Sequence, residues 1–316
     1  MSSAASPQRV VLIGSSLFTA RCLNQLLALT SLTVVGVVTN PQQFSISYAP
    51  SGVDNIRHAN MGALADNHGI PAYVMQTSMH EPALAEALTE WQPNVILVAG
   101  WYHMVPKAIR AIAPCLGLHA SLLPKYSGGA PLVWSLIENA TETGITLFIM
   151  DSGVDSGPII GQKSTAIHHQ DTIKTLYDRV EELGLELLSD CLPLFLNGDL
   201  VPRPQNESER TLYPQRKPSD GWLDLTLLTD TEVYNRVRAQ TAPYPGAFTR
   251  LNNQWAHLWS VSIVSTQQLL PYPELAPGEV TFFSNGTCWA RCKVGAIQLD
   301  TVSWLDSSPF PLSSNT

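Results

Sequence analysis

The stretch PNVILVAG at residues 93–100 is the most apolar run of this chain, and it decides the fold class that we predict. A continuous apolar run of this length that ends in glycine is typical of a strand buried on both faces of a parallel sheet. VVLIG at residues 10–14 has the same character and also ends in glycine. Both runs therefore predict interior strands of one sheet.

Strand and helix patterns alternate outward from these runs. Further strands are predicted at residues 32–40, 70–75, 145–151 and 158–167, and helices at 16–29, 61–68, 82–91 and 172–188. Residues 41–57, PQQFSISYAPSGVDNIR, are predicted as a long irregular loop. Strands that alternate with helices indicate an α/β domain with a Rossmann-like, mostly parallel sheet.

Ligands of such sheets bind beyond the carboxyl ends of the strands. The run that ends at Gly100 and the loop that begins at His119 are both placed to reach this edge. The first strand is followed by GSS at residues 14–16 and lacks the G-x-G-x-x-G pattern of dinucleotide-binding proteins. We therefore do not predict NAD as a cofactor.

The composition changes near residue 197, where a polar, proline-rich segment begins. A helix at about 229–240 and alternating runs at 255–264, 279–283 and 288–294 follow it, which indicates a small β-rich domain resembling an OB-like barrel. The expected organisation is a flexible tail (1–8), a catalytic domain (9–196), a linker (197–212), the β-rich domain (213–305) and a second tail (306–316).

The composition narrows the classes of function. The chain has 316 residues, 45% of them hydrophobic, and a net charge of −8, which does not favour a surface that grips a phosphate backbone. No run reaches the roughly 18 apolar residues of a membrane span. Five scattered cysteines fit free thiols in a reducing cytoplasm, and Cys288 and Cys292 lack the further ligands that a zinc site needs, so no metal is expected.

His119 and Asp155 are the candidate catalytic pair. His119 lies in GLHASLLPKYSGGAP (117–131), at the end of an apolar run, and Asp155 lies in the glycine-bracketed turn MDSGVDSG (150–157). An imidazole titrates near neutral pH, and a carboxylate at hydrogen-bond distance would orient the ring. This pair of residue types suits proton transfer.

GLHASLLPKYSGGAPLVW (117–134), followed by TGITLFIMDSGVDSG (143–157), strongly resembles the folate-dependent formyltransferases. The second half agrees, because YPQRKPSDGWLD (213–224) and VRAQTAPYPGAFT (237–249) are similar to the carboxy-terminal domain of methionyl-tRNA formyltransferases and sugar N-formyltransferases. The resemblance covers residues from about 9 to 305. It implies formyl transfer from 10-formyltetrahydrofolate to an amine, without a metal.

Within that resemblance, His119 would donate to the developing oxyanion or shuttle the proton of the amine, and Asp155 would hold His119 and act as the base. The family carries an asparagine two residues before the histidine, and this chain has Gly117 there. A backbone N–H, a water or Ser121 could replace that amide. Alternatively, the reaction could have become hydrolysis of the formylfolate, or the protein could bind folate without turnover.

The resemblance also implies which segments surround the catalytic pair. The SLLP loop that borders it comprises Ser121, Leu122, Leu123 and Pro124. Relatives usually carry arginine at the position of Ser127, so a basic contact in this loop is in doubt. The folate pocket would involve Trp101, Tyr102, Met104, Asp151 and Val154, since a pterin needs flat apolar walls. For Trp101 and Met104, core packing is an equally good interpretation.

The acceptor is the least determined part of the expected function. Methionyl-tRNA would require a basic surface, yet the loop at 41–57 carries one arginine, Arg57. Phe44, Tyr48 and Asn55 of the same loop suit a sugar, although surface packing is an equally good interpretation of them. We therefore expect a small amine, in particular an amino sugar on a nucleotide, and keep methionyl-tRNA, formylfolate hydrolysis and non-catalytic folate binding as alternatives. A homodimer stays open.

Overall fold

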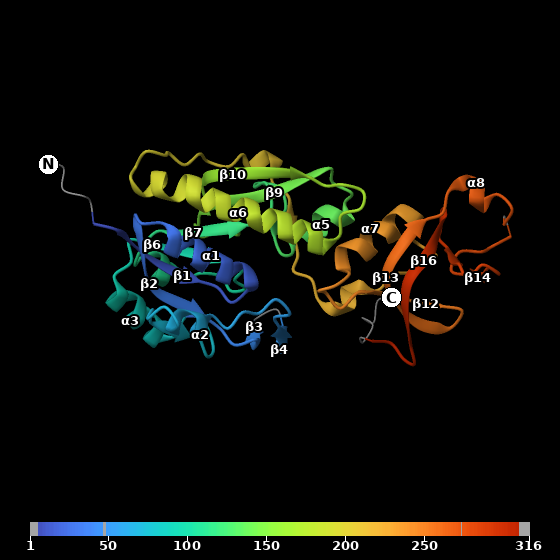
Figure 1. Ribbon diagram of the computed structural model, residues 1–316, viewed down its shortest axis with the longest axis horizontal. Helices are drawn as coiled ribbons and strands as arrows, with labels where there is room; N and C mark the ends of the chain where they lie inside the picture. The colour runs from blue at the N-terminus through green and yellow to red at the C-terminus, as the bar shows by residue number, and fades with distance from the viewer. Residues whose placement is uncertain (1–5, 47–48, 273, 310–316) are drawn as a thin grey trace. The chain divides into compact units, whose positions relative to one another are not determined.

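The computed structural model describes residues 6–46, 49–272 and 274–309 of the chain (Figure 1). It divides into two compact units. The first unit comprises residues 1–128, 144–165 and 179–212, and the second comprises 129–143, 166–178 and 213–316. The two expected tails fall mostly on residues 1–5 and 310–316, which lie outside the described residues.

A seven-stranded sheet in the order β10-β9-β7-β6-β1-β2-β5 forms the centre of the first unit, as far as the described residues extend (Figure 1). β1 pairs in parallel with β2 and β6, β2 with β5, and β6 with β7, whereas β9 is antiparallel to β7. The strands are β1 (Gln8–Ile13), β2 (Leu32–Thr39), β5 (Ala72–Val74), β6 (Val95–Ala99), β7 (Cys115–His119), β9 (Glu142–Ile149) and β10 (Ile159–Ala166). The predicted mostly parallel, Rossmann-like sheet is confirmed.

The helices of this unit are held by caps and apolar contacts. The helices are α1 (Leu17–Ala28), α2 (Met61–Asp66), α3 (Pro82–Trp91), α4 (Lys107–Arg110) and α6 (Ile173–Leu196), the last of which belongs to this unit from Arg179 onward. Ser16 caps α1 by accepting from the Thr19 N–H. Leu84 and Leu88 of α3 join Ile109 of α4 in a buried cluster with strand residues. α1 and α6 lie side by side (Figure 1) and are linked by a 2.6 Å hydrogen bond from Gln25 Nε2 to Ser189 Oγ.

The segment at 41–57 differs from its prediction. It contains an antiparallel hairpin of β3 (Gln43–Ile46) and β4 (Ala49–Asp54), where an irregular loop was expected. Residues 43–46, QFSI, do alternate polar and apolar side chains, with the apolar ones less exposed, so the strand signal was present but only four residues long. Tyr48 lies outside the described residues. The hairpin is anchored by Asn55, which is fully buried and donates from Nδ2 to the Ser15 carbonyl at 3.1 Å.

The second unit contains a five-stranded antiparallel sheet in the order β12-β13-β16-β15-β14, among the described residues. Its strands are β12 (Ala247–Leu251), β13 (Gln254–Ile263), β14 (Val280–Phe282), β15 (Cys288–Arg291) and β16 (Ala296–Leu305), and its helices are α5 (Pro131–Ile137), α7 (Asp230–Gln240) and α8 (Thr266–Leu269). Val233 and Val237 of α7 are buried with sheet residues. The expected separate β-rich part is therefore present.

Short elements complete the chain: β8 (Ser127–Gly128), β11 (Leu212–Tyr213), and 3-10 turns at Glu207–Glu209 and Pro218–Gly221. Within the described ranges, none of the helices combines the length and apolar character that a bilayer crossing requires.

Candidate functional site

β7 and β9 place the two predicted catalytic residues at one edge of the sheet. His119 is the last residue of β7 and pairs with Thr146 of β9. β9 ends at Ile149, and the turn that follows it carries Asp155. His119 Nδ1 lies 3.6 Å from Asp155 Oδ2, and the two side chains are 12% and 18% exposed. The structure therefore brings the pair together and leaves both groups within reach of a ligand.

A second contact of His119 fixes which ring nitrogen carries hydrogen. Nε2 lies 2.8 Å from the Tyr126 carbonyl oxygen. A carbonyl oxygen only accepts hydrogen bonds, so Nε2 is the donor and Nδ1 is the nitrogen that faces Asp155. Two opposed lone pairs would repel each other, so this arrangement suits one proton held between Nδ1 and Oδ2. The separation of 3.6 Å is longer than a hydrogen bond, and such contacts often tighten when substrate binds.

Asp155 has a backbone conformation that side chains other than glycine rarely adopt. Its φ is +53°, in the left-handed region, which costs on the order of 1–3 kcal/mol when it is not compensated. The Gly128 N–H donates to Asp155 Oδ2 at 2.8 Å. This bond orients the carboxylate toward His119. Backbone strain of this kind is concentrated at functional sites.

The SLLP loop is rigidly bonded beneath His119. Thr146 Oγ1 donates to the Ser121 carbonyl at 2.6 Å and accepts from the Leu123 N–H at 3.1 Å. Ser121 Oγ donates its hydrogen to the Lys125 carbonyl at 2.7 Å, so this hydroxyl is not available to replace the missing amide. Leu123 is buried, whereas Leu122 and Pro124 are partly buried.

The packing around position 117 explains why this position carries a glycine. It pairs with Phe148 of β9, and a Cβ at position 117 would lie 2.5 Å from Phe148 Cε1. Phe148 is 2% exposed and packs in a buried cluster with Leu123 and Ile159. The phenyl ring therefore occupies the space into which an asparagine side chain at 117 would extend.

The residues expected around a pterin are divided between core and surface. Trp101 packs against the core, as its alternative interpretation held. Met104 is 57% exposed, so core packing does not describe it, and Val154, which precedes Asp155, is 38% exposed and offers apolar surface beside the site. Tyr102 donates from its hydroxyl to Asn55 Oδ1 at 3.2 Å. Asp151 Oδ1 accepts from the Gly153 N–H and from Ser156 Oγ, so this carboxylate stabilises the turn that carries Asp155.

Three residues near the pair were not found from the sequence. Tyr126 supplies the acceptor for His119, while Gln205 and Arg210 donate to carbonyls of the Asp155 turn. Gln205 and Arg210 belong to the polar segment expected to be a linker, where composition gives no signal for such a contact.

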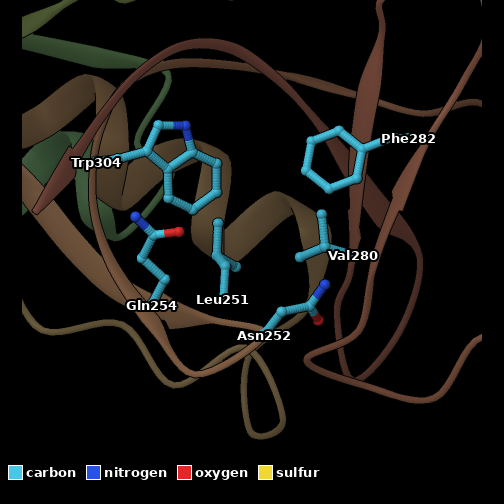
Figure 2. A pocket seen from close by; sticks show the side chains of 6 residues that line it. All are labelled: Leu251, Asn252, Gln254, Val280, Phe282 and Trp304. Atoms are coloured by element: carbon cyan, nitrogen blue, oxygen red, sulfur yellow. The ribbon is translucent and has the colours of Figure 1, made fainter.

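The second unit has a hollow of about 370 Å³ whose lining differs from this site (Figure 2). Phe282 and Trp304 face each other across it, Leu251 and Val280 form its floor, and the amides of Asn252 and Gln254 lie at its rim. None of these lining residues is titratable. Its side chains cannot transfer a proton, so the His119–Asp155 pair is the better candidate for chemistry.

Comparison with known proteins agrees with the geometry. Residues 8–192 match the family described as formyl transferase, and residues 216–315 match formyl transferase, C-terminal domain. The chain is 34% identical to a methionyl-tRNA formyltransferase of Trichlorobacter lovleyi over 81% of this chain and 78% of that protein.

Two solved structures share the fold. An N-formyltransferase from Helicobacter canadensis, in complex with folinic acid and dTDP-3-aminofucose, superimposes with a TM-score of 0.66 at 16% identity, over 94% of this chain and 100% of that one. HypX from Aquifex aeolicus in complex with tetrahydrofolic acid gives a TM-score of 0.60 at 17% identity, over 94% and 44%.

Proposed function

The chain belongs to the formyl transferase family, whose members are enzymes that transfer formyl groups, and we propose that it moves the formyl group of 10-formyltetrahydrofolate to the primary amine of an amino sugar carried on a nucleotide. The observation that carries this proposal is the His119–Asp155 pair at 3.6 Å, partly exposed at the edge of the sheet. The acceptor rests on the separate argument below.

The chemistry assigns a role to each atom of the pair. The amine nitrogen attacks the formyl carbon, an oxyanion develops, and the bond from that carbon to N10 of the folate then breaks. Asp155 Oδ2 takes the proton that the amine loses, and His119 Nδ1–H stabilises the oxyanion or returns a proton to N10. His119 Nε2–H stays bonded to the Tyr126 carbonyl, so it orients the ring and takes no part in transfer.

The β3–β4 hairpin supports a small acceptor. Arg57 is the only cation in the segment 41–57, and its guanidinium is paired with Glu181. Affinity for a nucleic acid comes largely from Lys and Arg contacts with phosphate. The ring of Phe44 lies 5.2 Å from that of Tyr102, which is bonded to Asn55. Aromatic rings and an amide suit the hydroxylated sugar part of such an acceptor.

Methionyl-tRNA is the second candidate acceptor, because relatives that share 31–34% identity with this chain are methionyl-tRNA formyltransferases. One experiment separates the candidates. Purified protein is incubated with 10-formyltetrahydrofolate alone, with nucleotide-linked amino sugars, or with methionyl-tRNA, and tetrahydrofolate release and formylated product are measured.

Each outcome of that experiment has one interpretation. Release that depends on the amino sugar, with a product heavier by one formyl group, supports the proposal. Release that depends on methionyl-tRNA alone would identify methionyl-tRNA as the acceptor in place of the amino sugar. Release without any amine identifies a hydrolase, and folate binding without release identifies a binding protein. The last two outcomes contradict the proposed transfer.

A further inference from the structure

Residues 203–211, here named the strap, run back along the first unit beside the catalytic turns. The strap begins at Arg203, whose N–H donates to the Ile159 carbonyl at 2.9 Å and whose carbonyl accepts from the Ile159 N–H at 2.8 Å. This pair of bonds joins the strap to β10, the strand that follows the Asp155 turn. A segment expected to connect two domains therefore packs at the active-site end of the sheet.

Gln205 of the strap holds the Asp155 turn from outside. Its Nε2 donates to the carbonyl oxygens of both Asp155 and Gly157, each at 2.7 Å. One amide thus ties together two carbonyls of the turn that contains the left-handed Asp155. Arg210 adds a hydrogen bond to the Val154 carbonyl. The strap thus bonds to the backbone of residues 154–157, while the Asp155 carboxylate accepts from Gly128.

Thr211, at the other end of the strap, holds the turn that orients His119. Thr211 Oγ1 accepts from the Tyr126 N–H at 2.8 Å, and the Thr211 carbonyl accepts from the Ser127 N–H at 2.9 Å. Tyr126 also has a left-handed φ, +55°, and its carbonyl accepts from His119 Nε2. The strap is therefore bonded to the residue that fixes the ring of His119.

We propose that the strap sets the distance between the catalytic groups, with Gln205 as the positioning residue for Asp155 and Thr211 as the positioning residue for His119. Asp155 and Tyr126 lie in left-handed turns on separate stretches of chain, and one segment bonds to both. This inference rests on the proposed function for its kinetic consequence, but its structural consequence can be measured without activity.

The bonding of Gln205 is directional. Its Oε1 is buried and lacks a hydrogen-bond partner among the described residues, whereas Nε2 makes two bonds. The reverse orientation would place Oε1 against two carbonyl oxygens, which only accept. The two hydrogen bonds from Nε2 therefore fix the orientation of the side chain. The unsatisfied Oε1 is the energetic cost of that orientation.

The test compares donor and non-donor side chains at position 205. Gln205→Met removes both N–H groups, Gln205→Glu replaces them with an acceptor that repels the carbonyls, and Gln205→Lys keeps a donor. Gln25→Met is the matched control, because Gln25 Nε2 makes a single hydrogen bond to Ser189 elsewhere in the same unit. Thr211→Val, with similar volume, removes the acceptor of the Tyr126 N–H.

We expect kcat to fall by about 10- to 100-fold in Gln205→Met, Gln205→Glu and Thr211→Val, since small displacements of reacting groups have effects of this size. KM for the formylfolate should stay unchanged, Gln205→Lys should recover most of kcat, and melting temperatures should match that of Gln25→Met. Crystal structures should show Asp155 leaving its left-handed φ in Gln205→Met and Gln205→Glu, and the His119–Asp155 separation changed from 3.6 Å in these two variants and in Thr211→Val.

Unchanged kcat in all variants, or a loss that follows melting temperature and is not recovered by lysine, would overturn the proposal. If the wild-type protein transfers no formyl group, the proposed function fails, and the crystal structures alone decide the inference: an undisturbed His119–Asp155 geometry in Gln205→Met and Thr211→Val rejects the strap as a positioning element.

Discussion

At the scale of single residues, Gly117 and Phe148 depend on each other for their packing. Phe148 fills the space beside the Gly117 backbone, and the phenyl ring is part of a buried cluster that also contains Leu123 of the SLLP loop. Replacement of the family asparagine by glycine is therefore linked to a bulky neighbour on β9. The loss of an amide next to His119 leaves Nδ1–H of that residue as the proposed donor to the oxyanion.

This pairing makes a prediction about stability. Gly117→Asn should lower the free energy of unfolding by about 1–3 kcal/mol, because its Cβ would meet Phe148 at 2.5 Å. In a Phe148→Ala background, the same change should cost markedly less, since the ring is gone. Urea unfolding of the two single variants and the double variant measures the coupling. Strictly additive effects would show that the two positions are independent.

At the scale of elements, the β3–β4 hairpin and α3 are held by single polar side chains. Tyr102→Phe removes the hydroxyl that donates to Asn55 at 3.2 Å. We expect KM for the acceptor to rise by on the order of 5-fold with little change in kcat, because one such hydrogen bond contributes about 1 kcal/mol. Tyr73→Phe, which removes a hydroxyl bonded to Glu81 instead, is the control. Equal effects of both changes on KM would show that the hairpin does not contribute to acceptor binding.

The lowered pKa of Glu81, at the start of α3, leads to a prediction about how the stability of the fold depends on pH. Burial raises its pKa, but hydrogen bonds from Tyr73, Thr77 and Ser78 outweigh burial and lower the pKa from 4.5 to about 2. A lowered carboxyl pKa stabilises the fold fully above pH 4.5, and this contribution disappears as pH falls toward about 2. Glu81→Gln should therefore be less stable than wild type at pH 7, with a difference that shrinks below pH 4.5.

Chemical unfolding of wild type and Glu81→Gln between pH 7 and pH 3 tests this. A stability difference that stays constant over that range would contradict the lowered pKa. Glu86→Gln, which removes another carboxylate of α3 but none of the hydrogen bonds to Glu81, is the control.

At the scale of the whole molecule, local patterns of the sequence predicted the candidate pair and the strands of the first sheet other than β7, which was recognised only as an apolar run before His119. Apolar runs such as Val95–Ala99 are buried along their whole length, so they identify interior strands without tertiary information. The same approach could not find the strap. Gln205 and Asp155 are 50 residues apart in the chain, and Thr211 and Tyr126 are 85 residues apart. Polar side chains in a proline-rich segment show no periodicity from which such long-range contacts could be predicted.

The division into units shows the same limit. Residues 129–143 and 166–178 group with the second unit, although both precede the change in composition near residue 197. α5 and α7 contact each other within that unit. Long-range contacts of this kind are set by packing, so a linear boundary drawn from composition does not reveal them. Localisation in the cytoplasm stays a prediction.

The central claim is that His119 and Asp155 act together in formyl transfer. The most direct test is the initial rate of acceptor-dependent tetrahydrofolate formation by His119→Ala and Asp155→Asn, with Asp190→Asn, a change in the surface ion pair with Lys163, as the control. We predict that each of the first two changes lowers kcat by about 100- to 10,000-fold with an unchanged melting temperature, while the control keeps the wild-type rate. A rate near that of the wild type in either His119→Ala or Asp155→Asn would contradict the claim.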